Sequence, residues 1–291
     1  MGLRFKFQIM RSSRFLFLST VLITAGLFTF TACHKTSSDD DVKQIDQEAG
    51  VASDQSTLEK NFSDVQSIAD EAGTTGSADL RVLGGGSVLG GCATVTRDTV
   101  SVPHTITVNF GTAPCLCQDG RYRSGEILVS YTGHYKDSGS VHSITFSNYF
   151  VDSNQVIGTK TVTNMGKNSS GQPYYDIQIN GGVVLANNNG TISWTTTRTR
   201  TWVAGYNTPA WNDDVYNVTG SGSITRANGN VVTVDITSPL VVALACRWIE
   251  QGTVQVTLAN GNTRVLDYGN GTCDALATYT VNGHTYNISL H

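Results

Sequence analysis

The stretch TISWTTTRTRTWV, residues 191–203, decides the fold class of this chain. One parity of the stretch holds its large side chains, which are Ile192, Trp194, Arg198, Arg200 and Trp202. The other parity holds only serine, threonine and the final valine. Successive side chains of a β-strand point to opposite faces of the sheet, so this alternation is typical of a strand. The stretch therefore predicts an antiparallel sheet with one buried face and one solvated face.

Similar segments follow one another from Cys92 to the end of the chain. They are rich in Val, Ile, Thr and Tyr and are separated by turn residues roughly every ten positions. The clearest cover residues 105–110, 125–135, 141–151, 191–203, 216–225, 231–237, 253–258, 275–281 and 285–290. Asn228-Gly229, Asn260-Gly261 and Asn282-Gly283 lie between such segments and favour two-residue hairpin turns. We expect residues 92–291 to form one all-β domain, an antiparallel meander of about 12 to 14 strands in a sandwich or a curved, partly closed barrel.

One amphipathic helix is predicted before this domain. Leu58, Phe62, Val65 and Ile68 recur at helical spacing, with charged and polar residues between them. Ser56 or Thr57 can cap its start. We expect the helix to span residues 57–73, and a glycine-rich linker to span residues 74–91.

The first 32 residues have the composition of an export signal. They carry four basic residues and no acidic one, and an apolar segment runs from Phe15 to Phe30. That segment has the length of a signal-peptide core and is short for a helix that spans a bilayer. It ends in Phe30-Thr31-Ala32-Cys33, which resembles the lipobox of bacterial lipoproteins. We predict a signal peptide at 1–32 and lipidation of Cys33.

An acidic tether is expected at residues 33–56. Residues 34–80 carry eleven Asp or Glu against three Lys, whereas residues 81–291 carry twelve charges of each sign. A neutral domain without a basic stripe argues against nucleic acid as a partner. Asp39, Asp40 and Asp41, just behind Cys33, resemble the surface-export signal of Bacteroidota lipoproteins. The expected partner is thus the membrane, reached through the lipid anchor, and the expected location is the outer membrane with the protein facing the cell exterior.

The remaining cysteines predict two disulfides. Export places them in an oxidising compartment, and Cys33 is used for lipid, which leaves an odd number of thiols. Chain order pairs Cys92 with Cys115 or Cys117, and Cys246 with Cys273. One of Cys115 and Cys117 therefore stays unpaired.

Two segments contain candidate ligand residues. Trp194, Arg198, Arg200 and Trp202 can form a platform for a sugar ring or a carboxylate. The alternative is that the arginines pair with Asp213 or Asp214 while the tryptophans pack in the core. In residues 267–274, Asp267, Asn270 and Asp274 offer oxygen ligands for calcium, and the alternative is a hairpin turn held by a disulfide. We expect no cofactor, and calcium is the metal that this pattern would suit.

Five segments together resemble an uncharacterised family of Bacteroidota lipoproteins with an all-β domain. They are residues 92–96, 119–125, 198–202, 246–248 and 267–274, which read CATVT, DGRYRSG, RTRTW, CRW and DYGNGTCD. The resemblance implies the source, the export route and the positions of the disulfides. It implies no catalytic residue, because the family carries no assigned activity. The additional cysteine at Cys115 or Cys117 departs from its pattern.

These features predict a non-enzymatic cell-envelope module for binding or adhesion, with a glycan or an envelope protein as partner. A carrier or assembly factor that holds a lipid or acyl chain inside the sheet is the first alternative. A glycosidase-like enzyme is the second, and it would draw its carboxylates from Asp213, Asp214, Asp235 and Glu250. The sequence shows no Gly-x-Ser-x-Gly elbow, zinc-protease helix or phosphate-binding loop.

Overall fold

The computed structural model describes residues 39–74, 89–208 and 213–290, and the side chains from residue 50 onward within them. The chain divides into two compact units, Met1–Val42 and Lys43–His291, and the second contains all the strands and most of the helix. The predicted signal peptide, Cys33 and most of the glycine-rich linker lie outside the described residues. Within the described residues, no helix combines the length and the apolar character that crossing a bilayer requires.

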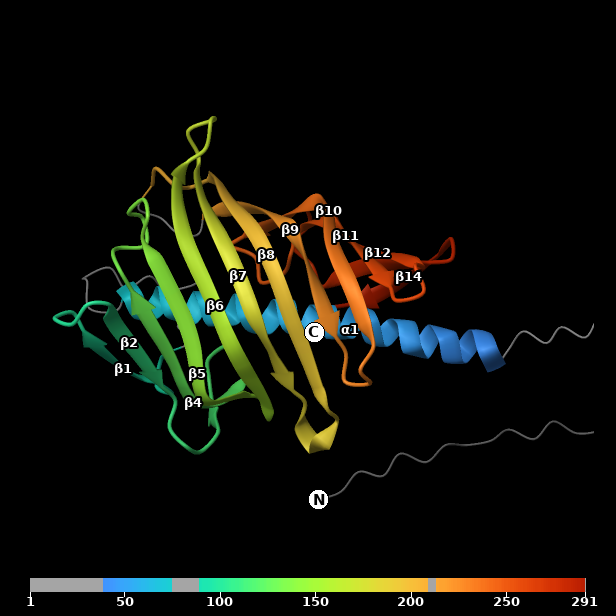
Figure 1. The fold of residues 1–291 in the computed structure, drawn as a ribbon, viewed down its shortest axis with the longest axis horizontal. Helices are drawn as coiled ribbons and strands as arrows, with labels where there is room; N and C mark the ends of the chain where they lie inside the picture. Colours follow the sequence, from blue (N-terminus) through green and yellow to red (C-terminus); the bar gives the residue numbers. More distant parts are fainter. Residues whose placement is uncertain (1–38, 75–88, 209–212, 291) are drawn as a thin grey trace, which may run out of the picture. The chain divides into compact units, whose positions relative to one another are not determined.

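The described residues form one large antiparallel sheet (Figure 1). Its strands are β1 (Thr94–Asp98), β2 (His104–Asn109), β3 (Cys115–Leu116), β4 (Tyr122–Tyr131), β5 (Val141–Val151), β6 (Asn154–Lys167), β7 (Pro173–Val184), β8 (Thr191–Ala204), β9 (Val215–Thr225), β10 (Val231–Ala243), β11 (Gln251–Leu258), β12 (Thr263–Asn270), β13 (Leu276–Val281) and β14 (His284–Ser289). A single 3₁₀ turn, η1 (Ala186–Asn188), lies between β7 and β8.

The sheet confirms the predicted meander. Its 14 strands follow chain order from β1 to β14, except that the short β3 pairs only with β4 at the side of this path. β1 and β14 are the two edges, so over the described residues the sheet is not closed into a barrel. All the described strands belong to one hydrogen-bonded sheet.

The helix is longer than predicted. It runs as α1 from Asp39 to Thr74, so the segment 39–56 is helical and not the flexible tether expected there. Val51 and Ala52 are buried, at 2% and 5% exposure, and extend the packed face beyond the predicted start. Apolar residues are few before Leu58, so the spacing of apolar residues indicates a helix only from Leu58 onward.

One face of α1 packs on the sheet (Figure 1). The four side chains of its predicted apolar stripe, Leu58, Phe62, Val65 and Ile68, are at most 1% exposed. The Phe62 ring meets the rings of Phe146 and Trp194 edge-on, with centroid distances of 6.1 Å and 5.7 Å. Opposite Phe62, a Cβ on Gly181 of β7 would lie 2.7 Å from Phe62 Cζ, so only glycine allows this approach. The helix is therefore part of the core of the β domain.

Basic side chains of the sheet reach α1 along its length. Arg226 Nε lies 2.6 Å from Asp54 Oδ2, and Lys160 Nζ donates to the carbonyl oxygen of Phe62 at 2.9 Å. Near the end of the helix, Arg97 of β1 donates to the carbonyl oxygen of Ala72. These donors come from β1, β6 and the β9–β10 turn, so they tie the helix to separate parts of the sheet.

Candidate functional site

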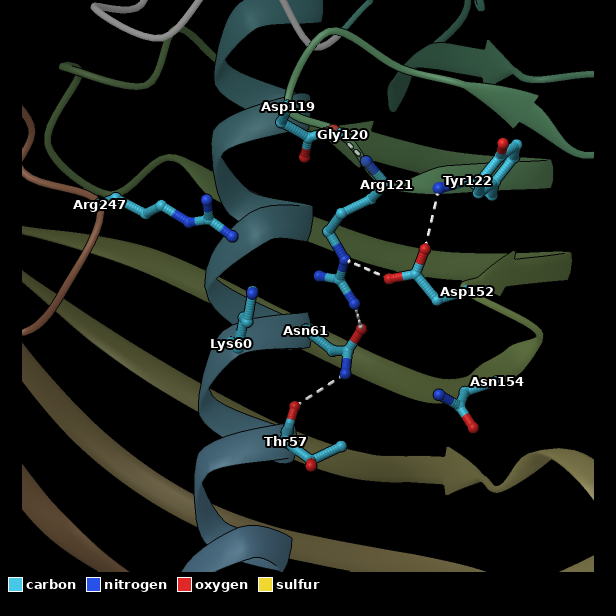
Figure 2. A pocket seen from close by; sticks show the side chains of 10 residues that line it. All are labelled: Thr57, Lys60, Asn61, Asp119, Gly120, Arg121, Tyr122, Asp152, Asn154 and Arg247. Atoms are coloured by element: carbon cyan, nitrogen blue, oxygen red, sulfur yellow. Dashed lines mark hydrogen bonds and ion pairs between the residues drawn. The ribbon is translucent and has the colours of Figure 1, made fainter. Parts of the chain in front are cut away.

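A pocket of about 520 Å³ opens where the helix meets three loops of the sheet (Figure 2). We call it the rim pocket. The loops are the β3–β4 turn, the β5–β6 turn and the β10–β11 connection. Its lining residues are Thr57, Lys60, Asn61, Asp119, Gly120, Arg121, Tyr122, Asp152, Asn154 and Arg247. Polar side chains dominate this set, so the pocket suits a polar ligand.

Two arginines of the β3–β4 hairpin neutralise the carboxylates around the rim pocket. Arg121 forms an ion pair with Asp64 of α1, and its Nε lies 2.8 Å from Asp152 Oδ2. Arg123 binds both oxygens of Asp119, at 2.7 Å and 2.6 Å. Burial opposes ionisation of Asp119, but the hydrogen bond and charge of Arg123 outweigh it, so the pKa of Asp119 is lowered. Burial raises the pKa of Asp64, against the opposing charges of Arg121 and Arg123. All three carboxylates are engaged by these two arginines.

Lys60 and Arg247 have no such partner among the described residues. Each instead lies over the ring of Trp248, with Lys60 Nζ 5.6 Å and Arg247 Cζ 5.0 Å from the ring centroid. The charged ends of both residues point into the space between the helix and the loop (Figure 2). Burial lowers the pKa of Lys60, and the nearby charges of Arg121 and Arg247 lower it further, against the opposing effect of Asp64 and Asp152. Two cations therefore face the same pocket, and no carboxylate in the described part of the chain neutralises them.

The other lining groups supply an aromatic surface and hydrogen-bonding groups. Tyr122 is 50% exposed. Asn154 Oδ1 accepts a hydrogen bond from the backbone N–H of Ala186 at 2.9 Å, which orients its amide. Asn61 Nδ2 donates to the carbonyl oxygen of Thr57 at 2.8 Å. The arrangement can bind a polar, negatively charged molecule that also presents an apolar face.

None of the four predicted platform residues lines the rim pocket, and Trp194 and Arg198 face the helix. Trp194 and Trp202 are buried, at 1% and 4% exposure, as the core-packing alternative expected. Arg198 holds Glu59 of α1 through two hydrogen bonds of 2.9 Å and 2.5 Å, and its guanidinium lies 4.7 Å from the centroid of the Trp194 ring. The expected pairing with Asp213 or Asp214 is therefore wrong for Arg198, because its side chain faces the helix.

Arg200 is surrounded by aromatic rings. Its Cζ lies 5.7 Å, 5.4 Å and 4.6 Å from the ring centroids of Tyr135, Tyr175 and Tyr216. Its Nε and one terminal nitrogen are buried without a hydrogen bond from the described residues. Neither Asp213 nor Asp214 is its ion-pair partner; Asp213 instead accepts a hydrogen bond from Thr208 Oγ1.

The three predicted calcium ligands each have a local hydrogen-bond partner. Asp267 Oδ1 accepts from the N–H of Gly269 at 2.9 Å, and Asp274 Oδ1 accepts from the N–H of Leu276 at 2.8 Å. Asn270 Oδ1 accepts from Thr272 Oγ1 at 3.1 Å. These contacts shape the end of β12 and the turn that follows it.

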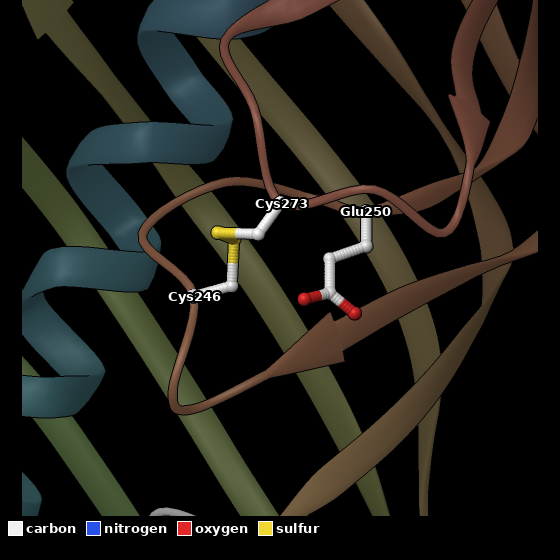
Figure 3. A group of neighbouring side chains, drawn as sticks. All are labelled: Cys246, Glu250 and Cys273. Carbon is white, nitrogen blue, oxygen red and sulfur yellow. A yellow bond between two sulfur atoms is a disulfide. The ribbon is translucent and has the colours of Figure 1, made fainter.

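A second group of metal-ligand atoms lies beside this turn. Ligand atoms of Cys246, Glu250 and Cys273 are all within 4.8 Å of one another (Figure 3). The two cysteines form a disulfide, and metal binding by cysteine requires the thiolate. In the disulfide form, Cys246 and Cys273 are therefore a cross-link beside the Glu250 carboxylate, and their sulfur atoms are not thiolate ligands.

The cysteine pairing confirms the prediction and resolves its open choice. The disulfides are Cys92–Cys115 and Cys246–Cys273. Cys117 is the free thiol, and it is 3% exposed. Burial raises the pKa of the Cys117 thiol, against the opposing effect of Arg123. Cys117 is thus poorly placed to react as a thiolate.

Comparisons of the chain with protein-family models, with curated proteins and with solved structures find no match. Lys60, Arg247 and Trp248 were not among the ligand residues predicted from the sequence. Lys60 lies off the apolar stripe of the helix, and Arg247-Trp248 follows a disulfide cysteine far along the chain. The adjacent basic and aromatic residues Arg247 and Trp248 are the one local sequence feature that could have indicated this ligand site.

Proposed function

We propose that the chain is a lipid-anchored protein of the cell envelope that binds a ligand in the rim pocket and catalyses no reaction. The observation that carries the proposal is the pair of cations, Lys60 and Arg247, that face an open polar pocket without a counter-ion among the described residues. Lys60 is half-buried and Arg247 is exposed. An unpaired charge is costly to hold at the half-buried position of Lys60, so its presence favours a ligand that completes the pairing.

The geometry favours binding over the two alternative functions. A glycosidase needs one carboxylic acid that is protonated near neutral pH. In the rim pocket, Asp119 has a lowered pKa and Asp152 is paired with Arg121. A carrier needs an open apolar interior, whereas side chains of α1 fill the face of the sheet over the described residues.

The lipid anchor and its membrane are supported by the sequence. The basic leader, the apolar segment and the lipobox-like end at Cys33 support export and lipidation, and the three aspartates support an outward-facing position in the outer membrane. Metabolic labelling with a radioactive fatty acid tests the anchor. Label on the wild type and none on Cys33→Ala is the expected result, and equal label on both would overturn it. Protease treatment of intact cells tests the outward-facing position, and a fully protected chain would contradict it.

Blocking the rim pocket tests the binding function. Thr57→Trp places an indole in the pocket from the helix, whereas Ser63→Trp places one at an exposed helix position outside it. Each purified, fluorescently labelled protein is applied to an array of neutral, uronic-acid-containing and sulfated saccharides. We expect the wild type and Ser63→Trp to bind the same saccharides and Thr57→Trp to lose them. Equal binding by Thr57→Trp, or no binding by the wild type, would contradict the proposal.

A further inference from the structure

Trp248 carries two cations on one indole ring. A single cation–π contact is favourable, and more so when it is desolvated. The second cation on the ring gains a similar contact but is repelled by the first. Lys60 comes from the helix and Arg247 from the β10–β11 connection, so the fold brings them together without any sequence proximity. An anion placed between the two charged ends would offset this repulsion.

The carboxylates around the rim pocket are already engaged and cannot supply that anion. Asp64 and Asp152 are ion-paired with Arg121, and Asp119 is held by both terminal nitrogens of Arg123. Each of these side chains is therefore fixed by an arginine of the β3–β4 hairpin. Among the described residues, these carboxylates are taken up by arginines, so a bound ligand would supply the negative charge that faces Lys60 and Arg247.

The rest of the lining favours a sugar as the carrier of this negative charge. Half-exposed Tyr122 offers a ring face for the C–H groups of a pyranose, and the amide of Asn154 suits its hydroxyl groups. Asn61 is buried, and its amide is already bound to Thr57 and Arg121. The volume of about 520 Å³ lies within the usual range for small-molecule sites. The planar guanidinium of Arg247 matches a carboxylate through two parallel hydrogen bonds.

Resting on the proposed binding function, we propose that the rim pocket binds an acidic saccharide through its carboxylate. In this proposal, Lys60 and Arg247 hold the carboxylate, and the sugar hydroxyl groups contact the amide of Asn154. A hexuronate is the simplest ligand of this class.

Calorimetric titration of the full purified protein with D-glucuronate, D-glucose and acetate tests the inference. We expect glucuronate to bind at least about tenfold more tightly than either of the others, because each lacks one half of the recognised chemistry. Lys60→Met and Arg247→Gln should each weaken glucuronate binding by about tenfold or more. Lys136→Met is the matched control, because Lys136 also lies over a tryptophan, 4.8 Å from the centroid of the Trp202 ring, but outside the rim pocket.

The outcomes separate this inference from the function on which it rests. Glucose binding as tightly as glucuronate would overturn the role of the carboxylate, and acetate doing so would overturn the role of the sugar. Loss of array binding in Thr57→Trp together with unchanged binding in Lys60→Met and Arg247→Gln would keep the binding function and overturn the acidic saccharide. An unaffected Thr57→Trp would overturn both. Circular dichroism of every variant, with a spectrum matching the wild type, establishes that losses reflect the site.

Discussion

Truncation of Phe62 tests whether the helix belongs to the core of the β domain. Phe62 is 1% exposed and touches two aromatic rings edge-on. Burial of a phenylalanine side chain stabilises a fold by about 1.5–3 kcal/mol, and each edge-on ring contact adds about 0.5–1.5 kcal/mol. Neighbouring Gly181 has no side chain that could move into the space left behind. We therefore expect Phe62→Ala to lower the free energy of unfolding by about 3–5 kcal/mol.

Equilibrium unfolding in urea, followed by tryptophan fluorescence, measures this loss. Trp194 lies on the sheet beside Phe62, so its emission reports separation of the helix from the sheet. Ser63→Ala changes the next residue, which is exposed, and should shift the unfolding free energy by less than about 0.5 kcal/mol. A loss below about 1 kcal/mol for Phe62→Ala would refute the reasoning, because it would mean that the helix leaves the sheet at little cost.

Three further perturbations probe the polar core and the cross-link. Burial lowers the pKa of Lys160 to about 8 from its usual 10.5, so between these pH values the unfolded chain binds more protons than the folded one. The unfolding free energy of the wild type, measured relative to that of Lys160→Met, should therefore rise by roughly 2–3 kcal/mol from pH 8 to 10.5. A difference that does not change with pH would contradict this prediction. Glu59→Leu or Arg198→Leu alone should cost about 3–5 kcal/mol in urea unfolding, and the double variant should cost less than the two together; strictly additive losses would count against a coupled pair. Replacing Cys246 and Cys273, which are 27 residues apart, by alanine should cost about 3–4 kcal/mol in the same assay, and no loss would show that the cross-link constrains nothing.

Local periodicity was enough to predict the fold class. The alternation in residues 191–203 matches β8, in which Trp194 and Trp202 face the core. The predicted segment 141–151 coincides with β5, and all three Asn-Gly dipeptides lie between consecutive strands. These features are short-range, so they can be read without knowing what a strand packs against.

Two strands in the middle of the sheet, β6 and β7, are not among the segments named from the sequence, and tertiary contacts explain their weak pattern. β6 places Lys160 on the buried face, where it donates to the carbonyl oxygen of Phe62. β7 contains Gly181, whose missing side chain makes room for the helix. A lysine and a glycine break the apolar alternation that marks a strand, and only the packed helix explains them.

The rim pocket could not be assembled from the sequence. Its charged residues come from positions 60, 119–121, 152 and 247, and the fold alone brings them together. Arg198 and Arg200, which were predicted from the sequence as ligand residues, have other contacts. Arg198 pairs with Glu59 of the helix, and Arg200 stacks on tyrosine rings. Charge pairing depends on distant partners, which periodicity does not reveal.

The pKa of Lys60 in the presence of a ligand tests the central claim most directly. Burial and the charges of Arg121 and Arg247 hold this pKa below the usual value for a lysine. Nuclear magnetic resonance of the Lys60 side chain, recorded across a pH series without ligand and with saturating D-glucuronate or D-glucose, measures it. Our account predicts that glucuronate raises the pKa of Lys60 and that glucose does not, because a bound carboxylate favours the protonated amine. A Lys60 pKa that is the same with and without glucuronate would contradict the assignment of the rim pocket as an acidic-saccharide site.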